Sequence, residues 1–308
     1  DPAGDRDRFR AIPSLKTFIE ERYMPYIQQE TRSHLNAVAY TRRIIALFGR
    51  KTLDELQVND VQAFKASLVK KGLANSTVNL HLATLRRIYN LAAKWQVWNG
   101  PNPTSSTGML PVRNREAHLS DAETGVLLSV LRSMPENDAM TAILILALTG
   151  ARRDEILHAR WENLDLSRGV LTVPLSKSGK PRYIFLPLEV VKILETHRQG
   201  RSGAYPHVFP SRKTDGPIQD IKRSWSKAKK LAGLPEDFRL HDLRHNFASS
   251  LVNKGVGLSE VGALLGHSDP RITMRYAHFD PQRLIKTASI ASVGWGPGAT
   301  GTATRETP

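Results

Sequence analysis

The sequence LGHSDPRITMRYAHFD, residues 265–280, places one tyrosine nine residues after a histidine, with arginines between them. These residues are His267, Arg271, Arg275 and Tyr276. A phenol has a pKa of about 10, so it is a weak nucleophile near neutrality unless its surroundings stabilise the phenolate. On its own, Tyr276 fits an ordinary packing aromatic as well as a nucleophile that attacks an anionic group. Residues elsewhere in the chain distinguish these two interpretations.

The charge of the chain indicates a polyanionic partner. The 308 residues include 44 Lys and Arg against 29 Asp and Glu, a net charge of +15. The excess is spread along the chain, with 18 basic and 10 acidic residues up to position 118 and 26 and 19 after it. Nucleic acid fits this charge better than a membrane surface, because no basic amphipathic helix stands out. We therefore expect a clamp around DNA and no membrane partner.

The sequence has no cysteine, which excludes a disulfide framework, a thiolate nucleophile and cysteine-ligated zinc. The longest apolar run, residues 142–148, is too short to cross a bilayer. Both features suit a protein of the cytoplasm.

Helical periodicity over the first 95 residues predicts a bundle of four amphipathic helices. The clearest apolar stripe lies in a helix expected at residues 76–95, and Asn59 or Asp60 is expected to cap the helix before it. The sequence WNGPNPTSSTG, residues 98–108, is typical of a linker. A second domain is expected to begin near Leu119, where Ser120 and Glu123 can form a capping box.

The second domain mixes helices with a little strand. An apolar helix at residues 140–148 ends at Gly150, and two short strands, at 170–173 and 183–186, flank the turn PLSKSGKP. Further helices are expected at residues 152–159, 188–198, 219–231, 241–254 and 258–265. The predicted fold class is therefore mainly α with a small β-sheet, a helical bundle followed by an α+β domain.

Two segments of this domain are ambiguous when each is considered alone. In LTGARRDEI, residues 148–156, Arg152 and Glu155 fit a surface ion pair or an arginine aimed at a phosphate and held by the glutamate. In KSGK, residues 177–180, Lys177 fits a solvated hairpin or a mobile proton donor, and the spacing is not that of a nucleotide P-loop.

The segment LHDLRHNFAS, residues 240–249, contains several side chains that could bind a phosphate or a metal ion. His241 and Arg244 are three residues apart and are expected on one helical face, with His245 one turn beyond His241. The two histidines have the spacing of a metal pair, but no acidic third ligand lies nearby in the sequence. A polar helix start and a His/Arg phosphate site both remain open for this segment.

Together these groups suit a metal-free attack on a phosphodiester. When a phenol oxygen attacks phosphorus, negative charge grows on the nonbridging oxygens and must be met by fixed cations or metal ions. No acidic cluster typical of a two-metal site is evident, so the arginines would supply this charge. We expect neither a metal nor a cofactor.

The segments TGARRDEI, SKSGKPRYIFLP, HDLRH and LGHSDPRITMRYAH, in this order and spacing, resemble the signature boxes of the tyrosine recombinase (phage integrase) family. The resemblance covers residues 14 to about 290, because the predicted bundle also resembles the core-DNA-binding domain of that family. It implies a flexible N-terminus, a DNA-binding bundle, a linker, a catalytic domain and a disordered tail, at residues 1–13, 14–105, 106–118, 119–293 and 294–308.

The resemblance implies roles for particular residues. Arg152, Arg244 and His267 would bind the scissile phosphate, and Glu155 would orient histidine and arginine side chains.

In the same pattern, Lys177 would act as general acid toward the 5′ oxygen, and His241 would assist proton transfer from the nucleophile. Tyr276 would form a 3′-phosphotyrosyl link. The sequence departs from the family at His158, where a leucine is usual.

The activity implied is site-specific recombination of duplex DNA without metal or ATP, for integration or excision of a mobile element. The family implies a homo-tetramer on specific recombination sites, with residues 281–293 docked on a neighbouring subunit. Accessory DNA-bending or directionality proteins and a location at the bacterial nucleoid are further expectations. The residues before the bundle are too few for the arm-site-binding domain of many phage integrases, so either arm sites are not needed or that domain is missing from this sequence. The alternatives are a type IB-like topoisomerase or hairpin resolvase, and a catalytically silent DNA-binding protein.

Overall fold

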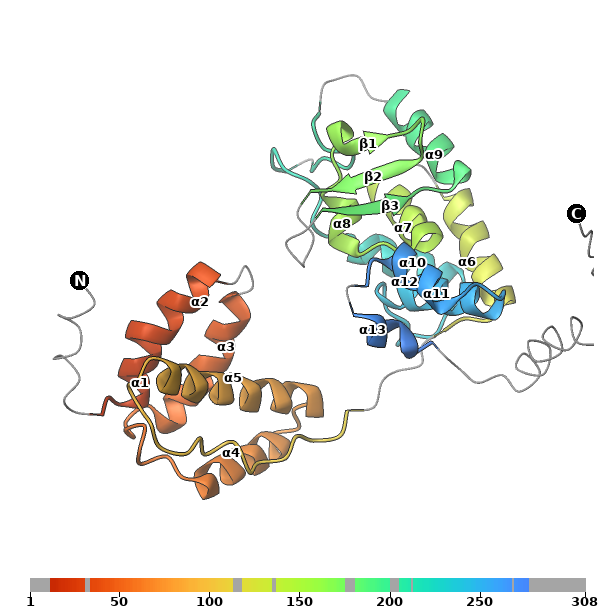
Figure 1. Ribbon diagram of the computed structural model, residues 1–308. Coiled ribbons are helices and arrows are strands. Elements are labelled where there is room, and N and C mark those ends of the chain that lie inside the picture. The colour runs from red at the N-terminus through yellow and green to blue at the C-terminus, as the bar shows by residue number, and fades with distance from the viewer. Residues whose placement is uncertain are drawn as a thin grey trace, which may run out of the picture. The chain divides into compact units, whose positions relative to one another are not determined.

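The computed structural model describes residues 12–30, 34–112, 118–134, 137–174, 181–199, 205–211, 213–267 and 269–276. The chain divides into two compact units, Asp1–Arg115 and Glu116–Pro308 (Figure 1). No helix among the described residues is long and apolar enough to span a membrane.

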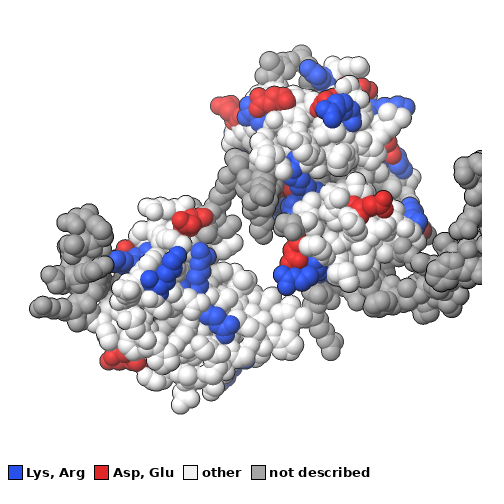
Figure 2. Space-filling model, viewed as in Figure 1, with Lys and Arg blue, Asp and Glu red and all other residues white. Residues whose placement is uncertain are grey.

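The first unit is a helical bundle. Its helices are α1 (Leu15–Phe18), the π-helical turn η2 (Ile19–Tyr23), α2 (Met24–Glu30), α3 (His34–Phe48), α4 (Val58–Lys70) and α5 (Asn75–Lys94). The predicted apolar stripe of α5 is confirmed, since Val78, Leu82 and Leu85 are all buried. On the face of this unit that Figure 2 draws, Lys and Arg side chains gather over one part of the surface.

The prediction that Asn59 or Asp60 is the N-cap residue of α4 is wrong. The helix begins at Val58, and Gln57 is the residue that precedes it. The Asp60 carboxylate instead lies one turn inside the helix, where it accepts hydrogen bonds from the Gln57 backbone N–H at 2.9 Å and from Lys51 Nζ at 2.7 Å. Asp60 therefore helps to cap α4 from inside its first turn, although it is not the residue that precedes the helix.

The second unit contains a three-stranded antiparallel sheet in the order β1-β2-β3. The strands are β1 (Leu164–Asp165), β2 (Val170–Val173) and β3 (Arg182–Phe185). β2 has the predicted bounds, whereas β3 begins one residue earlier than predicted, at Arg182. This shift matters because Arg182 and Ile184 point to the buried face, while Tyr183 and Phe185 are exposed.

Nine further helical segments complete the described part of this unit. They are α6 (Asp121–Ser133), α7 (Asp138–Thr149), α8 (Arg153–Leu157), the 3-10 turn η3 (Trp161–Asn163), α9 (Leu188–Gln199), α10 (Lys222–Leu231), α11 (Asp242–Asn253), α12 (Leu258–Leu265) and α13 (Pro270–Met274). The predicted bounds of α12 are confirmed, the helix predicted from residue 219 begins at Lys222, and α13 was not expected. The mainly α fold class with a small sheet is confirmed.

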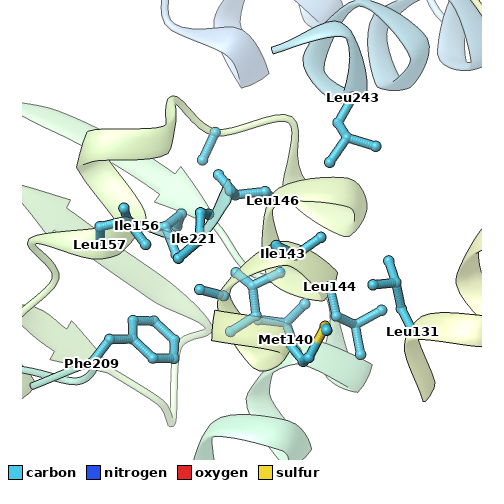
Figure 3. Packing of buried hydrophobic residues seen from close by; sticks show 14 of the residues in the cluster. Leu131, Met140, Ile143, Leu144, Leu146, Ile156, Leu157, Phe209, Ile221 and Leu243 are labelled. Atoms are coloured by element: carbon cyan, nitrogen blue, oxygen red, sulfur yellow. The ribbon is translucent and has the colours of Figure 1, made fainter. Parts of the chain in front are cut away.

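The apolar helix α7 forms the centre of this unit. Ala142 and Ile143 are fully buried, and Figure 3 shows Leu131 of α6, Ile156 of α8 and Leu243 of α11 around the labelled side chains of α7. A helix that is apolar on all sides is stable only when neighbours surround it, as they do here. The rigid core that results carries the loops of the candidate site.

The ends of two helices confirm the local sequence signals. At the start of α6, Ser120 Oγ accepts from the Glu123 N–H at 3.2 Å, and Glu123 Oε2 accepts from the Ser120 N–H at 2.8 Å. At the end of α7, Gly150 has φ +61°, and a Cβ there would lie 2.5 Å from the Phe247 ring. Gly150 therefore lets α7 end in close contact with α11.

Candidate active site

A buried carboxylate connects two arginines at the start of α8. Arg152 is the residue before the helix, and its Nη1 donates to Glu155 Oε1 at 2.9 Å. Arg182 of β3 donates through Nη1 to both Glu155 oxygens at 2.7 Å, and its Nη2 donates to the Leu264 carbonyl at 3.1 Å. The side chains of Arg182 and Glu155 are only 7% and 8% exposed, whereas that of Arg152 is 33% exposed. Glu155 therefore orients an arginine that remains accessible to a ligand.

The second candidate phosphate ligand, Arg244, is buried in α11. Its Nη1 donates to the Gly150 carbonyl at 2.8 Å, and its Nη2 donates to the Leu265 carbonyl at 2.7 Å. Gly150 lies two residues before Arg152, and Leu265 lies two residues before His267. Burial and, to a smaller extent, the charge of Arg152 together lower the pKa of the Arg244 guanidinium to about 10. One cation thus holds both loops that carry the other candidate ligands.

His267 follows α12 and is held by a buried hydroxyl. Its Nδ1 lies 2.8 Å from Thr273 Oγ1, and Thr273 is 3% exposed. Burial lowers the pKa of His267 to about 4, and the charges of Arg244 and Arg152 contribute. The ring is therefore neutral near pH 7, and one of its two nitrogens carries a proton.

His241 is the residue that precedes α11, and its side chain is exposed. Desolvation lowers the pKa of His241, and the Arg244 charge acts in the same direction. A neutral imidazole can accept a proton, as the expected assisting role requires.

A cavity of about 640 Å³ lies beside Arg152, His241 and Arg244, which line it together with Lys222 and Lys229 of α10. His267 is not among the residues that line it. The lining also contains Asp154 and Glu236, but its Lys and Arg residues outnumber them, which suits a phosphate group.

Tyr276 lies outside the lining of this cavity. It is 5% exposed, and its ring belongs to a small apolar cluster with Ala248, Val252, Val261 and Leu265. Its hydroxyl is 2.7 Å from Nδ1 of His245. Burial raises the pKa of the phenol, while the charges of Arg275 and Arg244 lower it. The hydroxyl is therefore close enough to Arg275 and Arg244 for their charges to act on it, and it is hydrogen-bonded to His245.

Some of the remaining sequence expectations concern residues that the structure describes, and others do not. Lys177, the segment 281–293 and the tail 294–308 lie outside the described residues. Within the described ranges, Glu155 accepts hydrogen bonds from two arginines, and no histidine donates a hydrogen bond to it. The same ranges contain no group of three or more His, Asp or Glu side chains that could hold a metal ion.

Sequence reasoning missed Arg182 and Thr273 and considered His245 only as a metal ligand. For Arg182 a signal existed, since a charged residue at an inward position of a strand needs a partner. For Thr273 and His245 no sequence signal identifies the partner, because their contacts depend on how α11, α12 and α13 pack.

The chain is similar to known DNA recombinases over both of its units. The family model described as phage integrase family matches residues 120–283, and the phage integrase N-terminal SAM-like domain matches residues 21–96. Tyrosine recombinase XerC of Xanthomonas campestris pv. campestris is 30% identical over 287 residues, covering 88% of this chain and 87% of the relative. Tyrosine recombinase XerC of Lactobacillus delbrueckii subsp. bulgaricus is 26% identical over 294 residues, covering 86% and 96%.

Two solved structures share the fold. The Tn1549 transposon integrase in complex with transposon right end DNA has a TM-score of 0.73 at 20% identity, covering 90% of this chain and 99% of that one. A lambda integrase dimer bound to a COC′ core site has a TM-score of 0.69 at 18% identity, covering 91% and 83%.

Proposed function

Since the chain belongs to the phage integrase family and is a tyrosine site-specific recombinase, we propose that it cleaves and rejoins DNA through a 3′-phosphotyrosyl bond at Tyr276. The observation that carries the proposal is the cavity that Arg152, His241 and Arg244 line together. A phosphodiester in this cavity would meet two guanidinium groups, which match phosphate oxygens through paired N–H donors.

The proposed chemical step takes its residue roles from the family resemblance described above. The Tyr276 oxygen attacks phosphorus, the bond from phosphorus to the 5′ oxygen breaks, and the phenol proton passes toward His241. Lys177 protonates the leaving 5′ oxygen. Arg152, Arg244 and His267 stabilise the charge on the nonbridging oxygens, and removal of one such donor costs about 3 to 4 kcal/mol of transition-state stabilisation.

Rejoining is the same step in reverse. The 5′ hydroxyl of a second strand attacks the phosphotyrosyl phosphorus and releases Tyr276, so the phosphodiester is restored without ATP. Cleavage and strand transfer therefore share one set of side chains.

The DNA backbone would run over the basic residues beside the cavity. Lys222, Arg223, Lys227 and Lys230 of α10 are exposed, and Lys222 also borders the cavity. Contacts of this kind release counterions, so binding should weaken steeply as the salt concentration rises. The net charge of +15 is consistent with an extended DNA interface.

The biological setting is proposed from the relatives. One solved relative is a lambda integrase tetramer bound to a Holliday junction, and another is the Tn1549 integrase with circular intermediate DNA. By analogy, this protein would act as a homo-tetramer on paired recombination sites of a mobile element. Accessory DNA-bending or directionality proteins would assist it at the bacterial nucleoid.

A pool of nicked duplexes with randomised arms tests the proposal, because the nick prevents religation and traps the covalent complex. The wild-type protein should give a DNA adduct that survives denaturation, and sequencing the trapped DNA would define the site. Tyr276→Phe should bind DNA but give no adduct. Tyr183→Phe, which changes an exposed tyrosine of β3, is the matched control and should react like the wild type. An adduct formed by Tyr276→Phe would overturn the assignment.

A further inference from the structure

The Tyr276 hydroxyl has a partner that the proposed chemistry does not use. His245 Nδ1 lies 2.7 Å from the phenol oxygen, and the two rings are 5.9 Å apart at 46°. His245 lies in α11, one turn after His241, and the two imidazole rings meet edge to face at 5.2 Å. The phenol, His245 and His241 thus form a continuous row of side chains.

The direction of this hydrogen bond follows from the surroundings of each group. Burial lowers the pKa of His245 to about 4, and the neighbouring charges of Arg275, His241 and Arg244 also lower it, while Asp242 raises it. Because burial raises the pKa of Tyr276, the phenol keeps its proton near neutrality. The phenol therefore donates to Nδ1, and the His245 proton resides on Nε2.

We infer that His245 is a positioning residue for the nucleophile: it accepts the Tyr276 hydrogen bond and holds the hydroxyl in a resting position outside the phosphate cavity. The inference rests on the proposed role of Tyr276. The geometry supports it in two ways, because Tyr276 is 5% exposed in an apolar cluster and does not line the cavity that Arg152 and Arg244 border. The hydroxyl must leave Nδ1 before it can reach a phosphate there.

His245 is also the group that makes this buried position stable. A phenol hydroxyl buried without an acceptor is unfavourable, whereas a satisfied hydrogen bond contributes about 1 kcal/mol. Loss of the acceptor should therefore raise the fraction of protein with Tyr276 released about five-fold, which corresponds to that energy.

Nitration of Tyr276 in the DNA-free protein, followed by peptide mass spectrometry, measures this release. His245→Leu removes the acceptor, and its nitration rate should rise about five-fold over the wild-type rate. His245→Asn is the conservative variant, because its side-chain oxygen can accept near the position of Nδ1, and it should restore most of the protection. An unchanged rate in His245→Leu would overturn the inference.

Val261→Ala separates the hydrogen bond from general loosening of the apolar cluster. Val261 is fully buried in the same apolar cluster as the Tyr276 ring, and its aliphatic side chain cannot hydrogen-bond to the hydroxyl, so nitration should rise less in this variant than in His245→Leu. Equal rates in the two variants would show that packing alone protects the ring.

The second measurement is single-turnover cleavage of DNA that carries the site identified by trapping. A resting position predicts that His245→Leu cleaves at least as fast as the wild type at saturating DNA. Slower cleavage by His245→Leu that His245→Asn rescues would assign His245 to the attacking state and overturn the resting role. The nitration result does not depend on adduct formation, so failure of this inference is distinguishable from failure of the proposed function.

Discussion

Neutralising Glu155 tests whether a buried ion pair holds the arginines of the site. Glu155 accepts two hydrogen bonds of 2.7 Å from the Arg182 guanidinium and one of 2.9 Å from the Arg152 guanidinium. Glu155→Gln keeps the shape of the side chain but leaves the buried Arg182 without a counter-charge. Removing one partner of a buried pair costs about 3 to 5 kcal/mol, so the free energy of unfolding of the second unit should fall by that amount.

An exposed ion pair in the same unit provides the matched control. Arg132 donates to both Glu189 oxygens, at 2.8 and 3.1 Å, but the two side chains are 49% and 42% exposed. Because solvent screens exposed pairs, Glu189→Gln should cost no more than about 1 kcal/mol. Because both carboxylates accept hydrogen bonds from arginine, a larger loss of stability in Glu155→Gln than in Glu189→Gln would measure the effect of burial.

A double variant completes the test. Arg182→Met combined with Glu155→Gln removes both charges, and replacement of both partners of a buried pair is often close to neutral. Urea unfolding followed by circular dichroism should therefore show that the double variant is more stable than Glu155→Gln alone. The reasoning is refuted if Glu155→Gln costs no more than Glu189→Gln, or if the second substitution adds to the loss.

Three further predictions follow from the site. Gly266→Ala should lose more stability than Gly233→Ala. Both glycines have φ above +60°, but a Cβ at Gly266 would lie 2.2 Å from Arg182 Nε, whereas one at Gly233 would meet nothing within 4 Å. Equal losses in urea unfolding would contradict the close contact at Gly266. The free energy of unfolding should fall as the pH drops from about 6.5 toward 4, because the pKa of His267 is lowered to about 4 in the fold and the unfolded chain binds the extra proton. His267→Gln should reduce this slope, and an unchanged slope would count against the shift. Arg152→Ala should slow single-turnover cleavage about 10²- to 10³-fold, and a loss below ten-fold would exclude a direct phosphate contact.

Elements with strong local signals are predicted well from the sequence. The bounds of β2 and α12 agree with the structure, and those of α5 agree within one residue. In each, the apolar spacing matches the face that is buried. Two short elements, β1 and α13, escape prediction because two and five residues carry too little periodicity.

The residues of the candidate site also differ in whether a local sequence signal identifies them. Motif spacing identifies Arg152, His241 and Arg244, which the structure brings to one cavity. It does not identify Arg182 as the second partner of Glu155, because the contact joins β3 to α8 across the fold. Long-range contacts of this kind depend on packing, which local patterns do not contain.

The resting position of Tyr276 also lies beyond sequence reasoning. The motif indicates which residue attacks, but the hydrogen bond to His245 depends on how α13 packs against α11. The structure therefore adds a contact of Tyr276 that the sequence does not show, and the inferred resting position rests on that contact.

We propose that cations from distant elements surround one phosphodiester and that Tyr276 attacks it. Protease digestion of the trapped protein–DNA adduct, followed by mass spectrometry, tests this proposal. We expect a nucleotide joined through its 3′ phosphate to the peptide that carries Tyr276. A nucleotide on any other residue, or DNA cut with no nucleotide on the protein, would contradict it.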